Sequence, residues 1–487
     1  MIFYLIFLLL SSYPAEGGIN INAPDMINSR VGGLIIRLSC PAIAGMILYS
    51  LLSIVDTIFV ARLGALPLAA LTLTIPVQIL LVSLSSATGT GITSLIGRTL
   101  GRSDIRMANN IGWHGIIISL VYGLGFMLLG LMYVDNLLLL FGCTAATFSL
   151  CHDYLFIVLS GSMSIFIPMT LGNIIQGEGN TLTPVLVSLS GMVLNVLFDP
   201  LFIFGVGIFP PMGLNGAAVA GILAQIICTV FMIIIIKSRP GILTWDFSHF
   251  RPDWEIIRGI YQVGMPTMVM ELAGVIVLAL LNRILAGYGF TAVAAMGIFM
   301  RVRSLAYMPV FGLSNAVMPV AAFAYGAGKL ERVKETLVKS ISLAVVFISA
   351  GWLIMQLQPV WIMSFFTQDA FLLKVGESCI RLATLFLPVM GPLIMLSTVL
   401  QSTGRGMQAM WIFLSRQGIF CLLIFLLPVW YDLQGIWLAF SLSELLSAAT
   451  AVPFIWHFWE AQSKKKIPVQ TIFMGRYLVN RWWAWLR

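Results

Sequence analysis

Twelve stretches of this sequence are apolar over the length that crosses a lipid bilayer, and this pattern constrains the fold more than any other feature. A membrane-spanning helix needs ~20 apolar residues, because the hydrocarbon core is ~30 Å thick and a helix rises ~1.5 Å per residue. The predicted spans are residues 34–59, 67–93, 109–133, 152–176, 181–205, 214–237, 258–286, 292–318, 337–357, 375–401, 406–428 and 433–457. We therefore predict an all-α polytopic membrane protein with twelve transmembrane helices.

Composition excludes several other classes of protein. Only 9% of the residues are charged and 59% are hydrophobic, whereas soluble proteins have about 25% charged residues. The net charge of +8 comes from short loops and the C-terminal tail, so we expect no nucleic-acid partner. The six cysteines are scattered without a Cys-x-x-Cys spacing, which predicts neither a disulfide framework nor a metal site.

The distribution of basic residues predicts the orientation in the membrane. An even number of spans places both termini on one side. One set of connections carries nearly all the basic residues, namely Arg30, Arg37, Arg98, Arg102, Arg106, Lys237, Arg239, Arg251, Arg258, Lys329, Arg332, Lys334, Lys339 and Arg405. The opposite set has only Arg62, Lys374 and Arg381. Because basic loops stay inside, we predict a multi-pass protein of the cell inner (cytoplasmic) membrane with both termini cytoplasmic.

The two ends of the chain are predicted to lie outside the helical bundles. Residues 1–33 form a cytoplasmic extension, whose apolar start is too short to span the membrane and lacks the basic start of a signal peptide. Met26 is a plausible alternative start, which would exclude residues 1–25 from the working protein. The tail, residues 458–487, mixes basic and indole side chains, so we expect it to lie at the inner surface of the lipid bilayer.

An internal repeat divides the chain into two halves. Several residues recur at a spacing of 225, namely Pro41 and Pro266, Gly64 and Gly289, Ala69-Ala70 and Ala294-Ala295, Gln176 and Gln401, and Gly179 and Gly404. Six helices per repeat make both halves enter the membrane in the same sense, with a cavity between them. We predict an N-lobe (34–237), a cytoplasmic linker (238–257) and a C-lobe (258–457) that rock to give alternating access. A static scaffold or channel remains an alternative.

Two acidic residues lie deep within predicted spans of the N-lobe. Asp56 and Asp199 both reach the outer half of this lobe, at about 33 Å and 27 Å along helices that rise from the cytoplasm. Ionisable groups in hydrocarbon usually face a cavity or a partner. Asn195 precedes Asp199 by one helical turn, so the two side chains share a face. This set can share a proton or bind Na⁺, although a structural hydrogen bond is equally open.

The C-lobe also has acidic residues within its spans. Glu271 and Glu444 lie near mid-membrane, and Arg301, Arg303 and Arg416 could neutralise them. For Glu271 an ion site and a structural salt bridge are both open. For Glu444 the structural interpretation is favoured.

The sequence lacks the motifs that would indicate an enzyme. Gln176-Gly-Glu-Gly179 is a glycine-rich turn in which Glu178 is expected to serve helix reversal. The chain has no phosphate-binding Gly-x-x-x-x-Gly-Lys-Ser/Thr, no His-Glu-x-x-His and no Gly-x-Ser-x-Gly, and its four histidines are dispersed. We predict no enzymatic activity, no ATPase and no cofactor beyond a coupling ion.

Three segments together resemble one transporter family. Pro41 to Gly64, the Gln176–Gly179 turn, and Leu194 to Pro200 leading into Gly213–Ala218 are similar to the multidrug and toxic compound extrusion (MATE) transporters. The resemblance covers residues 34 to about 457 and is closest to the DinF-like prokaryotic branch. It implies twelve helices in two lobes, and it maps the family's ion-responsive residues onto Asp56, Asn195 and Asp199.

The resemblance implies export of cationic, amphipathic drugs in exchange for H⁺ or Na⁺. Asn173 stands where relatives place further asparagines in the fourth helix, and Glu271 lies about one turn earlier than the seventh-helix glutamate of other branches. With Arg301, these residues are candidates for the substrate cavity or a C-lobe site. We expect a monomer. The alternatives are a flippase for lipid-linked saccharides, which would favour a more cationic cavity, and a passive channel.

Overall fold

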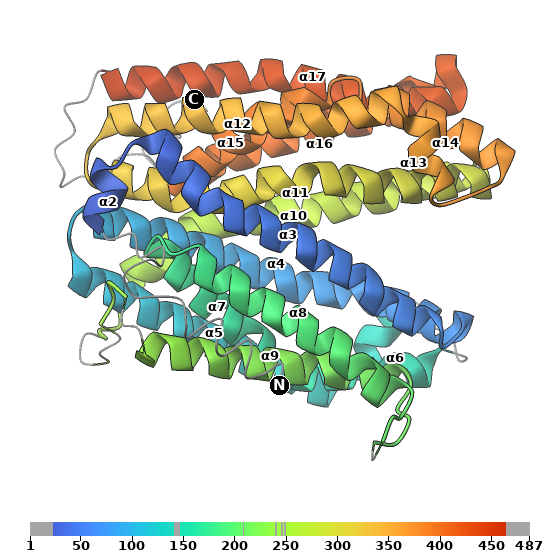
Figure 1. Cartoon of the computed structure of the whole chain (residues 1–487), viewed down its shortest axis with the longest axis horizontal. Helices are drawn as coiled ribbons and strands as arrows, with labels where there is room; N and C mark the ends of the chain where they lie inside the picture. Colours follow the sequence, from blue (N-terminus) through green and yellow to red (C-terminus); the bar gives the residue numbers. More distant parts are fainter. Residues whose placement is uncertain are drawn as a thin grey trace, which may run out of the picture.

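The computed structural model describes residues 23–140, 147–207, 209–238, 241–244, 247 and 250–463. The predictions for residues 1–22 and for the tail from Lys464 onward therefore lie outside the described residues. Every regular element in the described part is helical. In Figure 1 the long helices run side by side along the longest axis of the molecule.

The first half of the chain forms a short N-terminal helix and seven further helices. They are α2 (Ala23–Asn28), α3 (Val31–Ala61), α4 (Ala65–Gly101), α5 (Ile105–Leu140), α6 (Phe148–Ser160), α7 (Met163–Gly177), α8 (Leu182–Ile203) and α9 (Leu214–Ser238). The second half contains α10 (Trp254–Ala286), α11 (Phe290–Gly326), α12 (Leu330–Leu357), α13 (Pro359–Ser364), α14 (Ala370–Ala383), η2 (Leu387–Val389), α15 (Met390–Ser402), α16 (Gly406–Leu426) and α17 (Pro428–Ser463).

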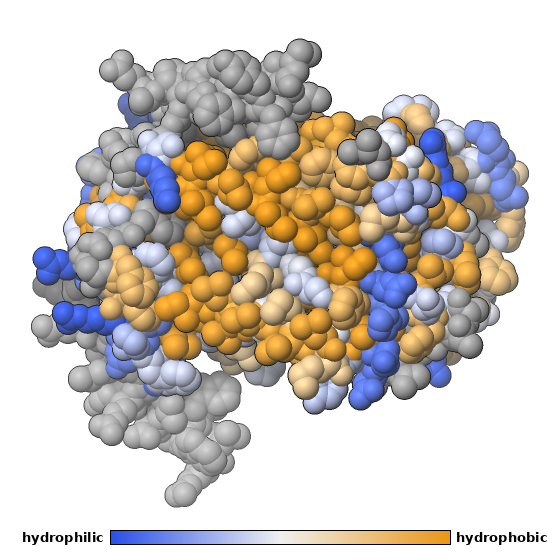
Figure 2. Space-filling view, turned by 90° about the horizontal axis from the view of Figure 1, so that it is seen from below, coloured by the Kyte–Doolittle hydropathy of each residue, from blue (hydrophilic) through white to orange (hydrophobic). Residues whose placement is uncertain are grey.

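The predicted class of fold is confirmed. Ten described helices are long and apolar enough to cross a membrane, and twelve spans result if the bent pairs α6–α7 and α14–α15 each count as one. Each predicted span falls on one of these helices or bent pairs. Figure 2 shows a broad apolar band on one face, with hydrophilic residues near both ends. Such a band is the surface that lipid would cover.

The repeat is visible in backbone geometry. Gly64 and Gly289, which precede α4 and α11, have φ of 109° and 98°, and Gly179 and Gly404 have φ of 99° and 81°. Glycine adopts this left-handed region without the steric cost that a Cβ imposes, so the two turns recur for a physical reason. Both bent pairs also bend by 45°, and their breaks lie at equivalent positions of the two halves.

The two halves are joined at one end of the molecule. We call α3–α9 the N-lobe and α10–α17 the C-lobe, and they occupy the lower and upper parts of Figure 1. The end at which α3 begins and α4 ends is called the inner end, following the predicted orientation. One buried cluster there draws on both lobes and includes Ile92, Ile96, Ile260, Val320 and Phe323. We call these five residues the inner seal.

Close backbone contacts reinforce the inner seal. A Cβ added to Gly326 of α11 would lie 2.0 Å from the carbonyl oxygen of Arg98, and one added to Gly101 of α4 would lie 2.3 Å from that of Phe323. Only glycine permits such an approach of two helices. The Ser94 hydroxyl also donates to the carbonyl of Gln401 at 2.7 Å. The inner end is therefore tightly closed.

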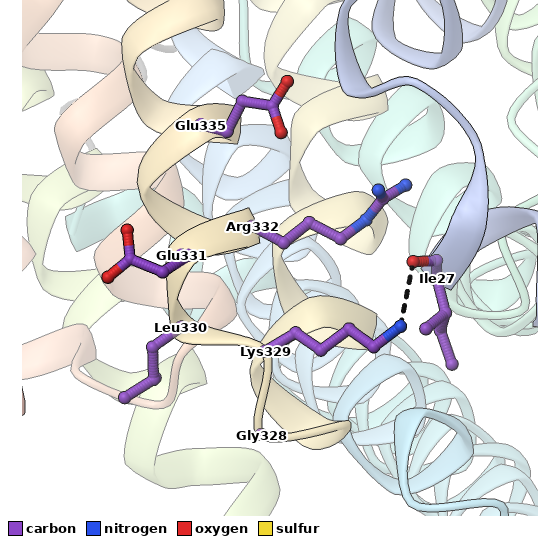
Figure 3. A pocket seen from close by; sticks show the side chains of 7 residues that line it. All are labelled: Ile27, Gly328, Lys329, Leu330, Glu331, Arg332 and Glu335. Atoms are coloured by element: carbon purple, nitrogen blue, oxygen red, sulfur yellow. Dashed lines mark hydrogen bonds between the residues drawn. The ribbon is translucent and has the colours of Figure 1, made fainter.

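The N-terminal helix α2 bridges the lobes at this end. Met26 is fully buried, and its side chain packs against Gly179 of the N-lobe, where it occupies the space that a Cβ would need. Its carbonyl oxygen accepts hydrogen bonds from Arg332 Nε and Nη2 at 3.0 and 2.8 Å. Figure 3 shows Arg332 and Lys329 extending from the start of α12 toward this segment. Met26 thus packs on one lobe and is held by the other.

The segment between the lobes is attached to the N-lobe. Leu243 N–H donates to the Glu178 carboxylate at 2.9 Å, and Arg251 N–H donates to Asn110 Oδ1 at 3.0 Å. Asp253 N–H donates to His114 Nε2 at 3.0 Å. Glu178 was expected only to serve helix reversal, but the structure shows that it also anchors the linker.

Glu178 is predicted to make stability depend on pH. Burial raises the pKa of Glu178 from its ordinary value of 4.5 to about 7, and the Leu243 hydrogen bond offsets part of the rise. The folded state then binds this proton more tightly than the unfolded state, so stability falls as pH rises through this window. The full effect is about 3 kcal/mol at ~1.4 kcal/mol per pKa unit. We expect Glu178→Gln to lose this dependence.

Thermal unfolding in detergent at pH 5 and pH 8 tests the role of Glu178. The glutamine retains an acceptor for Leu243 N–H but cannot ionise, so the wild-type protein should lose more stability between the two pH values than the variant. Other titrating groups contribute equally to both proteins. Parallel pH profiles would contradict the prediction.

Candidate ion-coupling site

Asp56 and Asp199 meet in the outer half of the N-lobe. Asp56 lies five residues before the end of α3, and Asp199 lies four residues before the end of α8. Their carboxyl groups interact directly, and Asp199 is fully buried. The helices α3 and α8 pack against each other. Helix length predicted the matching depth of the two acids, and the packing of α3 against α8 brings them together.

The carboxylate of Asp199 has unused hydrogen-bonding capacity. Neither of its buried oxygens has a hydrogen-bond partner of regular geometry in the described part of the chain. A buried carboxylate without donors is costly, and a bound proton or cation removes that cost. The residues present therefore fit either coupling ion. We name them the acidic site: Asp56, Asn195 and Asp199.

Asn195 lies on the same face of α8 as Asp199, one turn nearer the inner end. Its amide nitrogen would be 3.7 Å from a Cβ added to Gly221 of α9, so the side chain faces the neighbouring helix. Helix α8 continues through Pro200 and ends at Ile203. No hydrogen bond joins Asn195 to either carboxylate among the described residues, so its role as a ligand for the coupling ion stays a prediction.

Two further polar residues surround the acidic site. Tyr154 of α6 is buried and within electrostatic range of Asp56 and Asp199. Its hydroxyl accepts a hydrogen bond of 3.4 Å from Gln78 Nε2 of α4. Sequence analysis missed both residues. The signal for Gln78 was an amide within an apolar span, whereas an isolated tyrosine gives no such signal.

Glu271 lies between the lobes. The Ser86 hydroxyl of α4 donates to its carboxylate at 2.7 Å, and α4 and α10 pack closely. Ser86 and Glu271 both lie near the middle of their helices. On α4, Ser86 is further from the inner end than Ile92, Ser94 and Ile96, which also contact the C-lobe. Its described partner is thus a serine of the other lobe rather than the arginines considered from the sequence.

Asn173 and Arg301 lie apart from the acidic site. The Asn173 amide donates to the Met169 carbonyl at 2.7 Å and accepts from Thr93 at 3.3 Å. It also occupies the space beside Gly89 where a Cβ would lie, so it packs α7 against α4. Arg301 is exposed on α11. Their predicted roles at a substrate cavity stay predictions.

Glu444 forms the ion pair that was favoured from the sequence. Arg303 Nη2 of α11 donates to Glu444 Oε1 of α17 at 2.9 Å, and the glutamate is fully buried. The Tyr307 hydroxyl lies 3.4 Å from the same oxygen. The second arginine near this pair, Arg416 of α16, is within electrostatic range of Glu444.

The fold and the site together define a membrane transporter with two repeated lobes. The MatE family model matches residues 41–201 and 266–426, two segments offset by the repeat spacing of 225. The matched segments cover more than half of the sequence, and the chain belongs to the MatE family. It is a transporter and not an enzyme, as the missing catalytic motifs predicted.

Relatives with curated names span nearly the whole chain. A protein of Shewanella oneidensis named "FAD transporter" is 26% identical over 425 residues, covering 86% of this chain and 93% of the relative. "Multidrug export protein MepA" of Staphylococcus saprophyticus is 24% identical over 419 residues, covering 86% of this chain and 92% of the relative.

Solved structures share the fold. One is described as "Outward-facing conformation of a multidrug resistance MATE family transporter of the MOP superfamily"; it is 25% identical with a TM-score of 0.85, covering 92% of this chain and 99% of that one. Another, "Crystal structure of MATE in the straight conformation", is 25% identical with a TM-score of 0.86, covering 92% and 100%.

Proposed function

We propose that this protein is a secondary active antiporter that exports amphipathic organic compounds, including cationic drugs, in exchange for H⁺ or Na⁺. The observation that carries the proposal is the buried Asp199 carboxylate, which interacts with Asp56 and has no other hydrogen-bond partner among the described residues. Relatives named as multidrug export proteins support the substrate class. An ion entering at this site gains ~2.3 kcal/mol per charge per 100 mV.

The closed inner end supports an alternating-access mechanism. Buried residues of both lobes form one cluster at the inner seal. The other clusters each lie within one lobe, except that Val31 and Ile35, at the inner end of α3, pack into the C-lobe cluster. This arrangement fits a conformation in which the lobes separate at the outer end. Binding of an ion removes the repulsion between Asp56 and Asp199, so the preferred packing of α3 and α8 changes and the lobes can rock.

The remaining expectations belong to the same proposal. From the basic connections we infer that both termini are cytoplasmic and that the protein lies in the cell inner membrane. We propose that the protein works as a monomer, because a single chain contains both lobes and the acidic site. No cofactor other than the coupling ion is proposed, and the partners are organic solutes and the lipid bilayer.

Gradient-driven uptake tests the proposal against its alternatives. Proteoliposomes are loaded with one fluorescent organic cation, and its movement is followed under a pH gradient alone, a Na⁺ gradient alone, and neither. An antiporter accumulates the dye against its concentration gradient under one of the two. A passive channel only equilibrates the dye. A saccharide flippase moves lipid-linked sugars and leaves the dye unaffected, and either outcome would refute the proposal.

A further inference from the structure

Two arginines, one tyrosine and one glutamate gather in the middle of the C-lobe. We call Arg303, Tyr307, Arg416 and Glu444 the basic cluster. Arg303 lies about 20 Å from the outer end of α11, and Arg416 lies about 15 Å from either end of α16, at ~1.5 Å per residue. These depths place the cluster within the hydrocarbon region. Glu444 and Tyr307 are buried, and the Arg303 side chain is only 13% exposed, so protein surrounds most of the cluster.

Among the described residues, one carboxylate forms an ion pair with Arg303 and none does so with Arg416. Arg303 Nη2 donates to Glu444 Oε1 at 2.9 Å and to the Tyr307 hydroxyl at 3.1 Å. Arg416 stacks on the Phe413 ring, with its guanidinium carbon 5.2 Å from the ring centroid. In the described part of the chain, no carboxylate lies within 4.0 Å of the Arg416 guanidinium. Its electrostatic partners include Arg303, which repels it.

The charge of the basic cluster is not balanced. Two guanidinium groups, which stay protonated in proteins, face one carboxylate, so the cluster carries a net positive charge. The buried Nε atoms of both arginines have no hydrogen-bond partner among the described residues, nor does Glu444 Oε2. Charges within a membrane are normally paired. A guanidinium with a free N–H donor and no paired carboxylate can therefore bind an anion.

The repeat places the basic cluster opposite the acidic site. Arg303 is equivalent to Gln78, since the two are separated by the repeat spacing of 225. Gln78 donates to Tyr154 beside Asp56 and Asp199, and Arg303 contacts Tyr307 and Glu444. Equivalent places in the two lobes thus have opposite charge, with two acids in the N-lobe and an excess of one base in the C-lobe.

We propose that the basic cluster binds an anionic group, a carboxylate or a phosphate, with Arg416 and Arg303 as its donors. The planar guanidinium presents paired N–H groups that match the oxygens of both. Arg303 keeps 13% of its side chain exposed, so the cluster is not fully sealed from its surroundings. The inference rests on the proposed transport of an amphipathic solute and adds that the solute carries an anionic group. A free inorganic anion offers the same chemistry.

Two dyes that differ only in a carboxylate test whether the anionic group belongs to the transported solute or is a free inorganic anion. Rhodamine B has a free carboxylate, and its methyl ester does not. In proteoliposomes we expect Arg416→Gln to raise the half-saturating concentration of rhodamine B about tenfold or more, the effect of losing a charged hydrogen bond. The ester should be unaffected. Glu444→Gln should act in the opposite direction on rhodamine B, because it removes the competing carboxylate while retaining an acceptor for Arg303.

The matched control is Arg283→Gln, which removes the same charge from an exposed position in the last turn of α10. It should leave both dyes unchanged. In a second arm, thermal unfolding of the purified protein is compared in chloride, phosphate and gluconate at equal ionic strength. Stabilisation of the wild type by chloride or phosphate, lost in Arg416→Gln, would identify a free inorganic anion as the occupant.

The proposal is overturned if Arg416→Gln changes neither the discrimination between the dyes nor the anion dependence of unfolding. This outcome differs from failure of the proposed antiport. In that case the ester would show no gradient-driven transport by the wild-type protein or by any of the variants. Measuring the ester in every variant therefore separates the two results.

Discussion

Asp199→Asn is expected to abolish ion-driven export, reducing gradient-dependent transport to below about a tenth of the wild-type rate. Asparagine has nearly the same shape as aspartate but cannot carry the charge that a proton or Na⁺ must neutralise. The variant should fold, because an uncharged amide is cheaper to bury than a carboxylate without donors. Only the coupling should be lost.

Transport of a fluorescent organic cation under imposed pH and Na⁺ gradients measures this effect. The matched control is Asp135→Asn, the same chemical change at an exposed carboxylate near the outer end of α5. Dye binding in the absence of a gradient shows whether the variant retains its substrate site. Normal gradient-driven transport by Asp199→Asn would remove Asp199 from the mechanism.

Gly326→Ala is expected to open the inner seal. The added Cβ would lie 2.0 Å from the carbonyl oxygen of Arg98, which is backbone and cannot rotate away, so α11 must move from α4. Overpacking of this kind costs about 1–3 kcal/mol. If the cost falls only on the conformation with a closed inner end, its population falls by about 5–150-fold relative to others.

The accessibility of a cysteine at position 94 reports on the seal. Ser94 is fully buried beside Gln401 in the conformation described here. In a background without the native cysteines, Ser94→Cys should react faster with a thiol reagent when Gly326→Ala is present. Gly297→Ala is the matched control, because a Cβ at this glycine of the same helix meets nothing within 4 Å. Equal reactivity in all three proteins would contradict the prediction.

The helices were predictable because their signal is local. Membrane length and apolar composition identify a span without reference to any other span. Two spans differ from the prediction in shape. The spans that contain residues 161 and 386 were predicted as single helices, and each is a bent pair of helices. The prediction of an ion pair for Glu444 succeeded because a buried acid in hydrocarbon needs a basic partner, and few were available.

The polar contacts were less predictable because they depend on neighbours distant in sequence. Glu271 meets Ser86 across the lobes, and Glu178 meets Leu243 of the linker. No spacing rule relates these pairs. Asn173 was considered for a substrate cavity because of its place in the family pattern, and the structure shows that its amide also serves the packing of α7 against α4.

The sequence by itself determined the number of spans, the repeat and the depth of Asp56 and Asp199, because hydrophobic length and helical rise are properties of a single segment. Only the tertiary structure decided that these two acids face each other, that the inner end is closed, and that the C-lobe centre has an excess of positive charge. Those properties arise where helices far apart in the chain pack together, and helix rotation and crossing are set by packing rather than by local composition.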